Sequence, residues 1–175
     1  MTSVPRSAVV VAYDEDWPRR FEVLRAHVEP ALAGVAAVVE HVGSTAVPGL
    51  AAKPVIDVDV VVAGPADARA AVEALVGAGW RHQGDLGVPG REAFTVRPGL
   101  PEHHLYVVVR NSPAHRDHVD LRDHLRAHPA DAARYAAERR VRAGTPTTTV
   151  AGEPLEVLLW VSGRRDVARV DLTVA

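Results

Sequence analysis

The chain has 175 residues, 47% of them hydrophobic and 24% charged, which is the composition of an ordinary globular protein with one self-sufficient core. Its formal net charge of −2 supplies no long-range positive field, so general binding of nucleic acid is not expected. The absence of cysteine excludes disulfides, a thiol nucleophile and thiolate metal sites.

The N-terminal region is predicted to form a strand, a helix and a second strand. The first strand is expected at Val9 to Ala12, and the apolar run around it is too short for the core of a secretory signal, so we expect a cytoplasmic protein. A helix begins at Trp17-Pro18, because proline suits a first turn. One apolar stripe at helical spacing is expected to face the core: Trp17, Phe21, Leu24 and Val28. Gly34 ends or breaks this region before a strand at Val35 to Val42.

The centre of the chain is predicted to be a loop, a strand and a helix. Thr45 to Pro54 holds two prolines and one glycine among small residues, which favours a loop with at most one helical turn. Val55 to Val62 is β-branched except for its two aspartates and predicts a strand, and its apolar run is too short to span a bilayer. Ala66 to Gly77 predicts a helix. Its inward side chains are expected to be Ala68, Val72, Leu75 and Val76.

A glycine-rich stretch after Gly79 indicates an exposed hairpin or flap. Strands are expected at Glu92 to Val96 and His103 to Arg110, and helices at Arg116 to Ala127 and Ala130 to Ala143. Helices mixed with strands, without strict alternation, indicate an α+β fold with a mixed β-sheet flanked by helices. Because no repeat or long linker divides the chain, residues 1–175 are predicted to be a single domain.

Two carboxylates lie one residue apart on the central strand. Asp57 and Asp59 therefore project from the same face, where their charges repel each other. A divalent cation would remove that conflict, and Mg²⁺ is commonly held by one or two carboxylates together with phosphate oxygens. The alternative is that this face of the strand is solvated and the two aspartates only mark its polar side.

The turn Gly43-Ser44 lies just upstream of these carboxylates. A Gly-Ser turn at a strand end offers backbone N–H groups and a hydroxyl at close range, which is how proteins bind phosphate. Twelve residues then separate Ser44 from Asp57, which is followed by Val58 and Asp59. This combined pattern resembles the signature of the nucleotidyltransferase superfamily.

A longer string carries a closer resemblance. HVGSTAVPGLAAKPVIDVDVVV, with the upstream YDEDWPRRFE and the downstream HHLYVV and LRDHLRAHP, resembles the GrpB family, small proteins with a nucleotidyltransferase-like fold. The resemblance covers roughly Val9 to Arg140 and implies that fold. Residues 145–175 depart most from the family; Thr145 to Thr149 predicts a loop or edge strand, and a further apolar run follows at Leu155 to Val161.

The resemblance implies a reaction and the residues for it. Gly43 and Ser44 would hold the β and γ phosphates of a nucleoside triphosphate (NTP), and Asp57 and Asp59 would bind the Mg²⁺ that bridges to them. An acceptor hydroxyl would attack the α-phosphorus as pyrophosphate leaves. The acceptor, a small molecule or a protein, the preferred base and the oligomeric state cannot be read from this sequence.

The superfamily adds a third carboxylate on a neighbouring strand, and this chain has no obvious one. On the strand at His103 to Arg110, parity places Glu102, His104 and Tyr106 on one face, and Glu102 would serve only if the strand begins early enough to aim it inward. His104 is expected to act as base or phosphate partner, or else as a hydrogen-bonded structural residue. The missing carboxylate keeps open a second function: nucleotide or phosphate binding without transfer.

Basic residues near the motif are candidates for phosphate contacts. Lys53 and Arg91 are the predicted nucleotide-binding cations, with Arg97 as a further candidate, and the alternative is that they are solvated. Arg122 and Arg126 share a helix face at i,i+4. His124 and His128 have the same spacing, but the helix lacks the glutamate of a zinc protease, and a solvated pair is expected there.

Overall fold

Residues 10–141, 148–151 and 171–174 are described by a computed structural model. Their main feature is a five-stranded sheet in the spatial order β1-β2-β5-β4-β3. Its strands are β1 (Ala37–Val42), β2 (Ile56–Val62), β3 (His82–Gly84), β4 (Arg91–Phe94) and β5 (His103–Val109). Only the central pair, β2 and β5, is parallel, and the other neighbours are antiparallel. The α+β fold with a mixed sheet is therefore confirmed.

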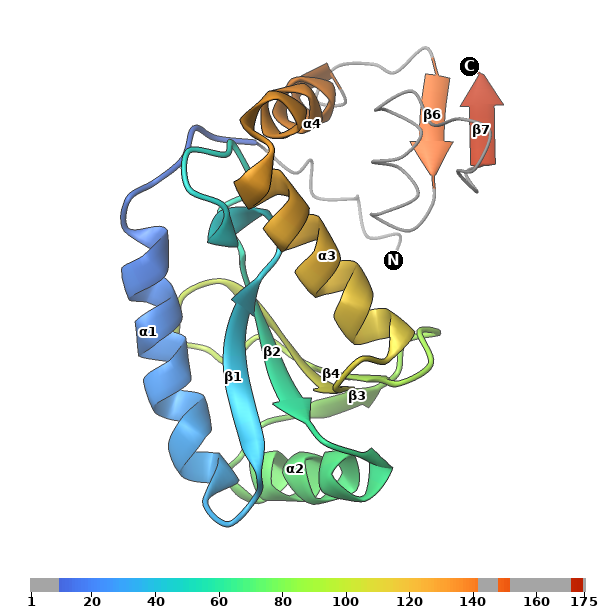
Figure 1. The fold of residues 1–175 in the computed structure, drawn as a ribbon. Coiled ribbons are helices and arrows are strands. Elements are labelled where there is room, and N and C mark those ends of the chain that lie inside the picture. The colour runs from blue at the N-terminus through green and yellow to red at the C-terminus, as the bar shows by residue number, and fades with distance from the viewer. Residues whose placement is uncertain (1–9, 142–147, 152–170, 175) are drawn as a thin grey trace, which may run out of the picture.

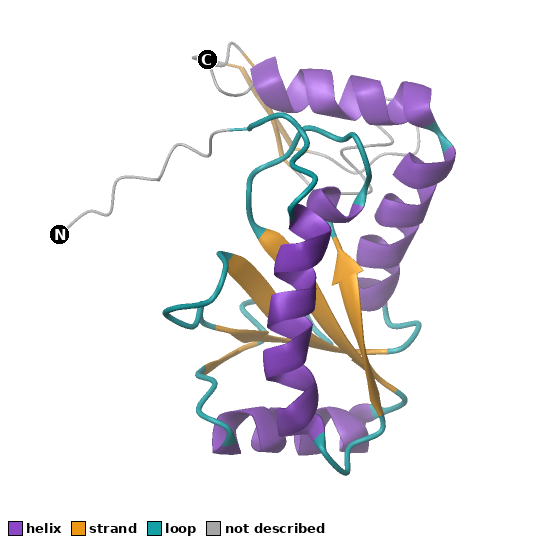
Figure 2. Ribbon diagram, turned by 90° about the vertical axis from the view of Figure 1, so that its left-hand side faces the viewer, coloured by secondary structure: helices purple, strands orange, loops and turns teal. Residues whose placement is uncertain are grey.

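The two faces of the sheet are covered by different helices (Figures 1 and 2). Alternate side chains of β2, such as Val58 and Val60, belong to the main core with α1 (Trp17–Val28) and α2 (Pro65–Gly77). Val61 faces the other way and packs with Val108 and with Ala114 of α3 (Pro113–Ala127). The period-2 alternation of a strand therefore sends Asp57 and Asp59 to the α3 face, and Val58 and Val60 to the core.

The first helix follows its predicted pattern. All four stripe residues of α1 are buried, as the helical spacing predicts: Trp17, Phe21, Leu24 and Val28. A short 3₁₀ helix, η1 (Glu29–Leu32), continues from it, and Gly34 then turns the chain toward β1 with a φ of +86°. The predicted strand at Val9 to Ala12 is reduced to one bridge between Val11 and Ala52, and residue 9 lies outside the described residues.

The second helix corrects one prediction about the core. Leu75 is fully buried, and Ala68 and Val72 pack against the core as expected. Val76, however, is 47% exposed, and Ala71 is buried instead. Each residue of a helix is rotated by about 100° from the residue before it. Val76 is therefore turned away from the face that Leu75 shares with Ala71.

The remaining elements agree with the sequence apart from their ends. The glycine-rich stretch is the β3–β4 hairpin, and a 3₁₀ turn, η2 (Ser44–Ala46), stands at the start of the predicted loop. Helix α3 begins three residues before the predicted Arg116, because Ser112 accepts a hydrogen bond from the backbone N–H of His115 (3.2 Å) and Pro113 fits the first turn. Helix α4 (Pro129–Val141) follows directly.

The C-terminal region is described only in part. β6 (Thr148–Ala151) and β7 (Asp171–Val174) form a two-stranded antiparallel sheet. The apolar run at Leu155 to Val161 lies outside the described residues. Among the helices that are described, none has the length and hydropathy needed to cross a membrane.

The burial of α2 yields a stability prediction. Leu75→Ala should lower the free energy of unfolding by about 2–5 kcal/mol, because a fully buried leucine leaves a cavity. The neighbouring Val76→Ala should change it by no more than about 0.5 kcal/mol, because that side chain is half exposed. Urea unfolding of both variants measures the difference, and equal losses would contradict this orientation of the helix.

Candidate functional site

The turn after β1 is built around a close approach that only glycine permits. Gly43 has φ +72° and ψ −171°, a backbone conformation that residues with a side chain avoid. A Cβ added there would lie 2.1 Å from Oδ2 of Asp57. The glycine therefore allows the Asp57 carboxylate to lie directly against the turn, so the two halves of the sequence motif form one site.

The turn is also tied to the start of β2 from the core side. His41 Nε2 lies 3.0 Å from Oγ1 of Thr45, whose hydroxyl donates in turn to the carbonyl of Val55 at 3.3 Å. The ring of His41 stacks on Phe21 with 4.8 Å between centroids. Burial lowers the pKa of His41 to about 4, so the ring is neutral near pH 7 and donates through Nε2.

The two aspartates lie side by side on the α3 face of the sheet. In the strand register Asp57 lies between Val42 and His104, and Asp59 lies between Glu40 and Tyr106. Asp59 is fully buried, whereas the side chain of Asp57 is 29% exposed. One carboxylate is thus open to a ligand and the other is enclosed by the protein.

Asp57 is paired with His104, the histidine that the sequence analysis selected. Nδ1 of His104 lies 2.7 Å from Oδ1 of Asp57. This hydrogen bond raises the pKa of His104, and the charge of Asp57 adds to the effect against the opposing effect of burial. His104 is half exposed, at 52%, with Nε2 as the ring nitrogen opposite the carboxylate. The sequence left two roles for His104, a hydrogen-bonded structural residue or a base or phosphate partner. Both are compatible with the structure, because the ring is hydrogen-bonded and also accessible.

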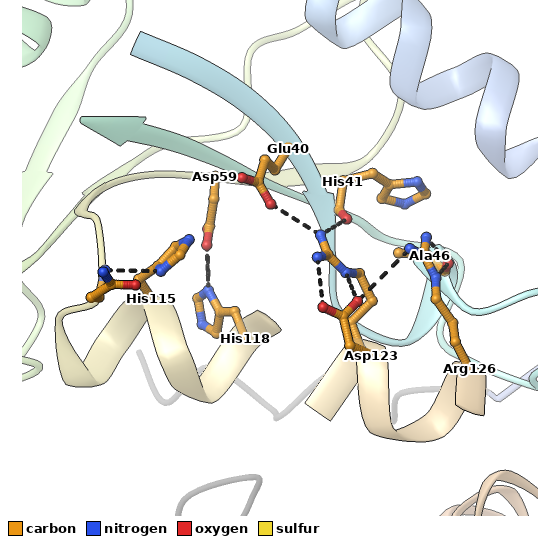
Figure 3. A network of polar contacts seen from close by, with 10 residues as sticks. Glu40, His41, Ala46, Asp59, His115, His118, Asp123 and Arg126 are labelled. Atoms are coloured by element: carbon orange, nitrogen blue, oxygen red, sulfur yellow. Dashed lines mark hydrogen bonds and ion pairs between the residues drawn. The ribbon is translucent and has the colours of Figure 1, made fainter. Parts of the chain in front are cut away.

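Asp59 is paired with His118 of α3, a residue that the sequence analysis missed. Nδ1 of His118 lies 2.9 Å from Oδ2 and 3.1 Å from Oδ1 of Asp59, and Figure 3 shows the two side chains pointing toward each other. Burial raises the pKa of Asp59. Burial also acts to lower the pKa of His118, but the hydrogen bond and charge of Asp59 outweigh it and the pKa is raised. The surroundings thus raise the pKa of both groups of the pair.

The place beside Asp59 on β5 belongs to Tyr106. Because β5 begins at His103, Glu102 lies outside the strand and is exposed; its backbone carbonyl accepts from Ile56 N–H, and its charge adds to the raised pKa of His104. An acidic side chain on the same face is supplied instead by β1, where Glu40 is the register partner of Asp59. Glu40 is already engaged, since Arg122 contacts it at 3.1 Å (Figure 3).

The predicted phosphate cations lie in different surroundings. The guanidinium of Arg91 lies 4.6 Å from the ring centroid of Tyr106, and its buried Nε has no hydrogen-bond partner among the residues that the structure describes. Lys53 is exposed in the loop before β2 and is near enough to act on the pKa of His104. Arg97 lies elsewhere, 5.3 Å from the ring of Trp80. The structure thus brings Arg91 and Lys53 to the aspartates and leaves Arg97 away from them.

The donor set suits a hard divalent cation that also binds phosphate. In the part of the chain that the structure describes, no three histidine, aspartate or glutamate side chains converge as a metal site. Asp57 and Asp59 would therefore supply two carboxylates only, which is the usual protein contribution to Mg²⁺ when phosphate and water complete the coordination. Oδ2 of Asp57 faces the Gly43 turn, where phosphate would bring its oxygens.

The histidine pair of α3 is largely solvent-exposed, as expected from the sequence, since the side chain of His124 is 39% exposed and His128 is exposed. The rings of His124 and His128 stack with 4.2 Å between centroids, and Nε2 of His124 lies 2.9 Å from Asp131 of α4. The pair thus joins the end of α3 to α4, because α4 begins one residue after His128.

Comparison with known proteins finds a matching family and several relatives. The sequence profile of the GrpB protein family matches residues 7–151. A UPF0157 protein of Streptomyces coelicolor is 33% identical over 160 residues, which are 90% of this chain and 83% of that protein. The UPF0157 protein YqkA of Bacillus subtilis is 29% identical over 135 residues, and the match spans 77% of this chain but only 39% of YqkA.

Solved structures extend the comparison to the fold. The crystal structure of GrpB from Enterococcus faecalis superposes with a TM-score of 0.65 at 30% identity, covering 75% of this chain and 81% of that one. The Cid1 poly(U) polymerase with bound MgGTP gives a TM-score of 0.52 at 14% identity, covering 74% of this chain and 43% of the polymerase. The fold is therefore nucleotidyltransferase-like, and at this identity the likeness to the polymerase concerns the fold alone.

The close approach at the turn predicts different effects for two glycines. Gly43→Ala should cost about 1–3 kcal/mol in backbone strain and should also displace the Asp57 carboxylate. Gly49→Ala is the matched control, because Gly49 has φ +77° but open space around its Cα. Thermal unfolding measures the strain in both variants, and binding of Mn²⁺, a paramagnetic substitute for Mg²⁺, should be lost only in Gly43→Ala. Equal Mn²⁺ binding by the two variants would contradict the contact.

The Asp57–His104 contact predicts a pH dependence. The pKa of His104 should lie above 6.5 and should fall in Asp57→Asn, because the variant removes the negative charge that favours the imidazolium. Since the folded-state pKa is raised, the contact stabilises the fold below pH 6.5 and this contribution is lost as the pH rises through the folded-state pKa. NMR titration of the histidine ring protons measures the shift. An unchanged His104 pKa in the variant would show that the pair does not form in solution.

Proposed function

The chain belongs to the GrpB family, and we propose that it is a Mg²⁺-dependent nucleotidyltransferase that transfers a nucleoside monophosphate from an NTP to an unidentified small-molecule or protein acceptor. The observation that carries the proposal is the contact of Gly43 with Asp57, which places a phosphate turn and a metal-type carboxylate at one point. As the chain spans less than half of YqkA, the proposal concerns this domain and not the longer relative.

Each residue of the motif has a role in this proposal. The turn at Gly43 and Ser44 receives the β and γ phosphates, and Asp57 and Asp59 hold Mg²⁺ against them. The bound metal supplies charge neutralisation for the triphosphate. Oδ2 of Asp57 faces the turn while Oδ1 accepts from His104, so Asp57 can bind a ligand and orient the histidine at the same time.

Positive side chains around the aspartates complete the proposed nucleotide site. Arg91 is held over Tyr106, and no described residue accepts a hydrogen bond from its Nε, so a phosphate oxygen would supply an acceptor there. Lys53 is exposed in the loop before β2, near enough to His104 to act on its pKa, and contributes charge rather than a fixed contact. Because the chain has a net charge of −2, it can attract a polyanion only through a local cluster of basic residues, and Arg91 and Lys53 are that cluster in this proposal.

His104 is the proposed acceptor for the proton that the reaction releases. When the acceptor oxygen attacks the α-phosphorus, the bond to the bridging oxygen breaks, pyrophosphate leaves and the attacking hydroxyl gives up its proton. Nδ1 of His104 is held by Asp57, so the neutral ring presents Nε2 as a base. In this proposal His104 takes the part of the third carboxylate, and the residue beside Asp59 on β5 is Tyr106.

A second candidate function is nucleotide binding without transfer. It is favoured by Asp59, which is fully buried and engaged at both oxygens by His118. A metal at Asp59 would have to displace this histidine or share the carboxylate with it. Both candidate functions require NTP and Mg²⁺, so the cytoplasmic location expected from the sequence is compatible with either one.

Isothermal titration with ATP, GTP, CTP and UTP, each with and without Mg²⁺, tests the shared part of the two candidates. We expect binding that requires Mg²⁺ and is weakened at least tenfold in Asp57→Asn, because one charged ligand of the metal is lost. Asp67→Asn is the matched control, since Asp67 lies in the first turn of α2, away from the α3 face. Binding that needs no metal, or that is equal in both variants, would contradict the proposed site.

Release of pyrophosphate separates transfer from binding. The wild-type protein should release pyrophosphate from the preferred NTP when it is supplied with a pool of cell metabolites and proteins, and His104→Gln should slow that release while leaving NTP affinity within about twofold. Tight Mg²⁺-dependent binding without pyrophosphate would favour the second candidate.

A further inference from the structure

Helix α3 contacts the phosphate turn through two arginines that the motif does not include. We propose that Arg122 and Arg126 are positioning residues: they hold residues 43–46 in the geometry that receives the triphosphate without contacting the triphosphate themselves. The proposal deepens the function proposed above and rests on it for the identity of the ligand.

Arg126 fixes the downstream end of the turn. Its Nε and Nη2 atoms both donate to the backbone carbonyl of Ala46, at 3.0 and 2.6 Å (Figure 3). Ala46 is buried and is the last residue of η2. A guanidinium that donates twice to one carbonyl fixes both the position and the direction of that peptide group, which a lysine cannot do with a single point charge.

Arg122 fixes the upstream end. Nη1 donates to the backbone carbonyl of His41 at 3.2 Å and to Oε2 of Glu40 at 3.1 Å. Nε and Nη2 donate to Asp123, so the guanidinium is bonded on both edges and the side chain is only 13% exposed. Because its donors are used in this way, Arg122 holds the backbone just before Gly43 and does not point at a ligand.

The helix that carries the arginines is itself packed on the same loop. Leu121 and Leu125 of α3 form a buried apolar cluster with Val47 and Leu50, which follow the turn. Close packing of these four buried side chains holds α3 at a constant distance from the turn, so the helix that carries Arg122 and Arg126 has a fixed position.

One face of α3 contacts Asp59 and the backbone on both sides of the Gly43-Ser44 turn. His118, Arg122 and Arg126 recur at i, i+4 and i+8 and reach in turn Asp59, the end of β1 and the end of η2. The same helix face thus sets the carboxylate strand and the phosphate turn relative to each other. If the arginines only anchored the helix through ion pairs, they would not need to donate to backbone carbonyls. Instead they donate to the carbonyls of His41 and Ala46, on the two sides of Gly43.

The test compares Arg126→Gln and Arg126→Lys with Arg116→Gln, an exposed arginine of the same helix, in the full-length protein. Hydrogen exchange of the amides of residues 44–47 without ligand is measured first. Arg126→Gln should speed this exchange about tenfold or more, because the carbonyl of Ala46 loses both of its arginine hydrogen bonds. Arg116→Gln should leave the exchange unchanged. Unchanged exchange in Arg126→Gln, or equal acceleration throughout the sheet, would overturn the proposal.

Binding measurements then separate positioning from charge. Affinity for Mg²⁺-ATP should fall about tenfold in Arg126→Gln and nearly as far in Arg126→Lys, whereas Mn²⁺ alone should bind within about twofold of wild type, because the aspartates are untouched. Full recovery of ATP affinity in Arg126→Lys would show that the charge of the side chain matters and not its two hydrogen bonds, and would overturn the proposal. Should the wild-type protein bind no nucleotide, the proposed function fails, and the exchange measurement still decides whether the arginines hold the turn.

Discussion

The site depends on the absence of one side chain. With a hydrogen in place of Cβ at Gly43, the carboxylate of Asp57 lies against the turn, whereas a methyl group would lie 2.1 Å from its oxygen. The left-handed φ of +72° at the same residue turns the chain from β1 into η2. Both effects come from glycine, and together they join a phosphate-type turn to a metal-type carboxylate that is fourteen residues away in the chain.

The second constraint is the cost of burying acid on this face of the sheet. Glu40, Asp57 and Asp59 are neighbours in the register, and unpaired they would repel one another in a poorly hydrated place. Each has a different basic partner: Arg122, His104 and His118. Two of these partners come from α3, so the helix that covers the face also neutralises it. Of the two aspartates, Asp57, whose partner comes from β5, is the one left partly exposed to a ligand.

Much of this arrangement follows from local sequence rules. The spacing of Trp17, Phe21 and Leu24 predicts the buried face of α1, and the alternation of β2 places both aspartates on one side. The family resemblance, confirmed over residues 7–151, carries the fold. Val76 was assigned to the core wrongly because a run of apolar residues at the end of α2 does not show which of them the helical rotation turns outward.

The polar contacts of α3 could not be predicted in the same way. His118 meets Asp59 across a separation of 59 residues, and which face of α3 lies on the sheet is decided by the packing of Leu121, Leu125 and Ala114. The signal in the sequence is a polar stripe at i, i+4 and i+8, and the sequence analysis pairs only Arg122 and Arg126 of its three residues. A crystal structure with Mn²⁺ and a non-hydrolysable NTP tests the central claim most directly. The account predicts anomalous density for Mn²⁺ between Asp57 and Asp59, with the β and γ phosphates on the Gly43-Ser44 turn; a nucleotide bound elsewhere, or Mn²⁺ without contact to Asp57, would contradict it.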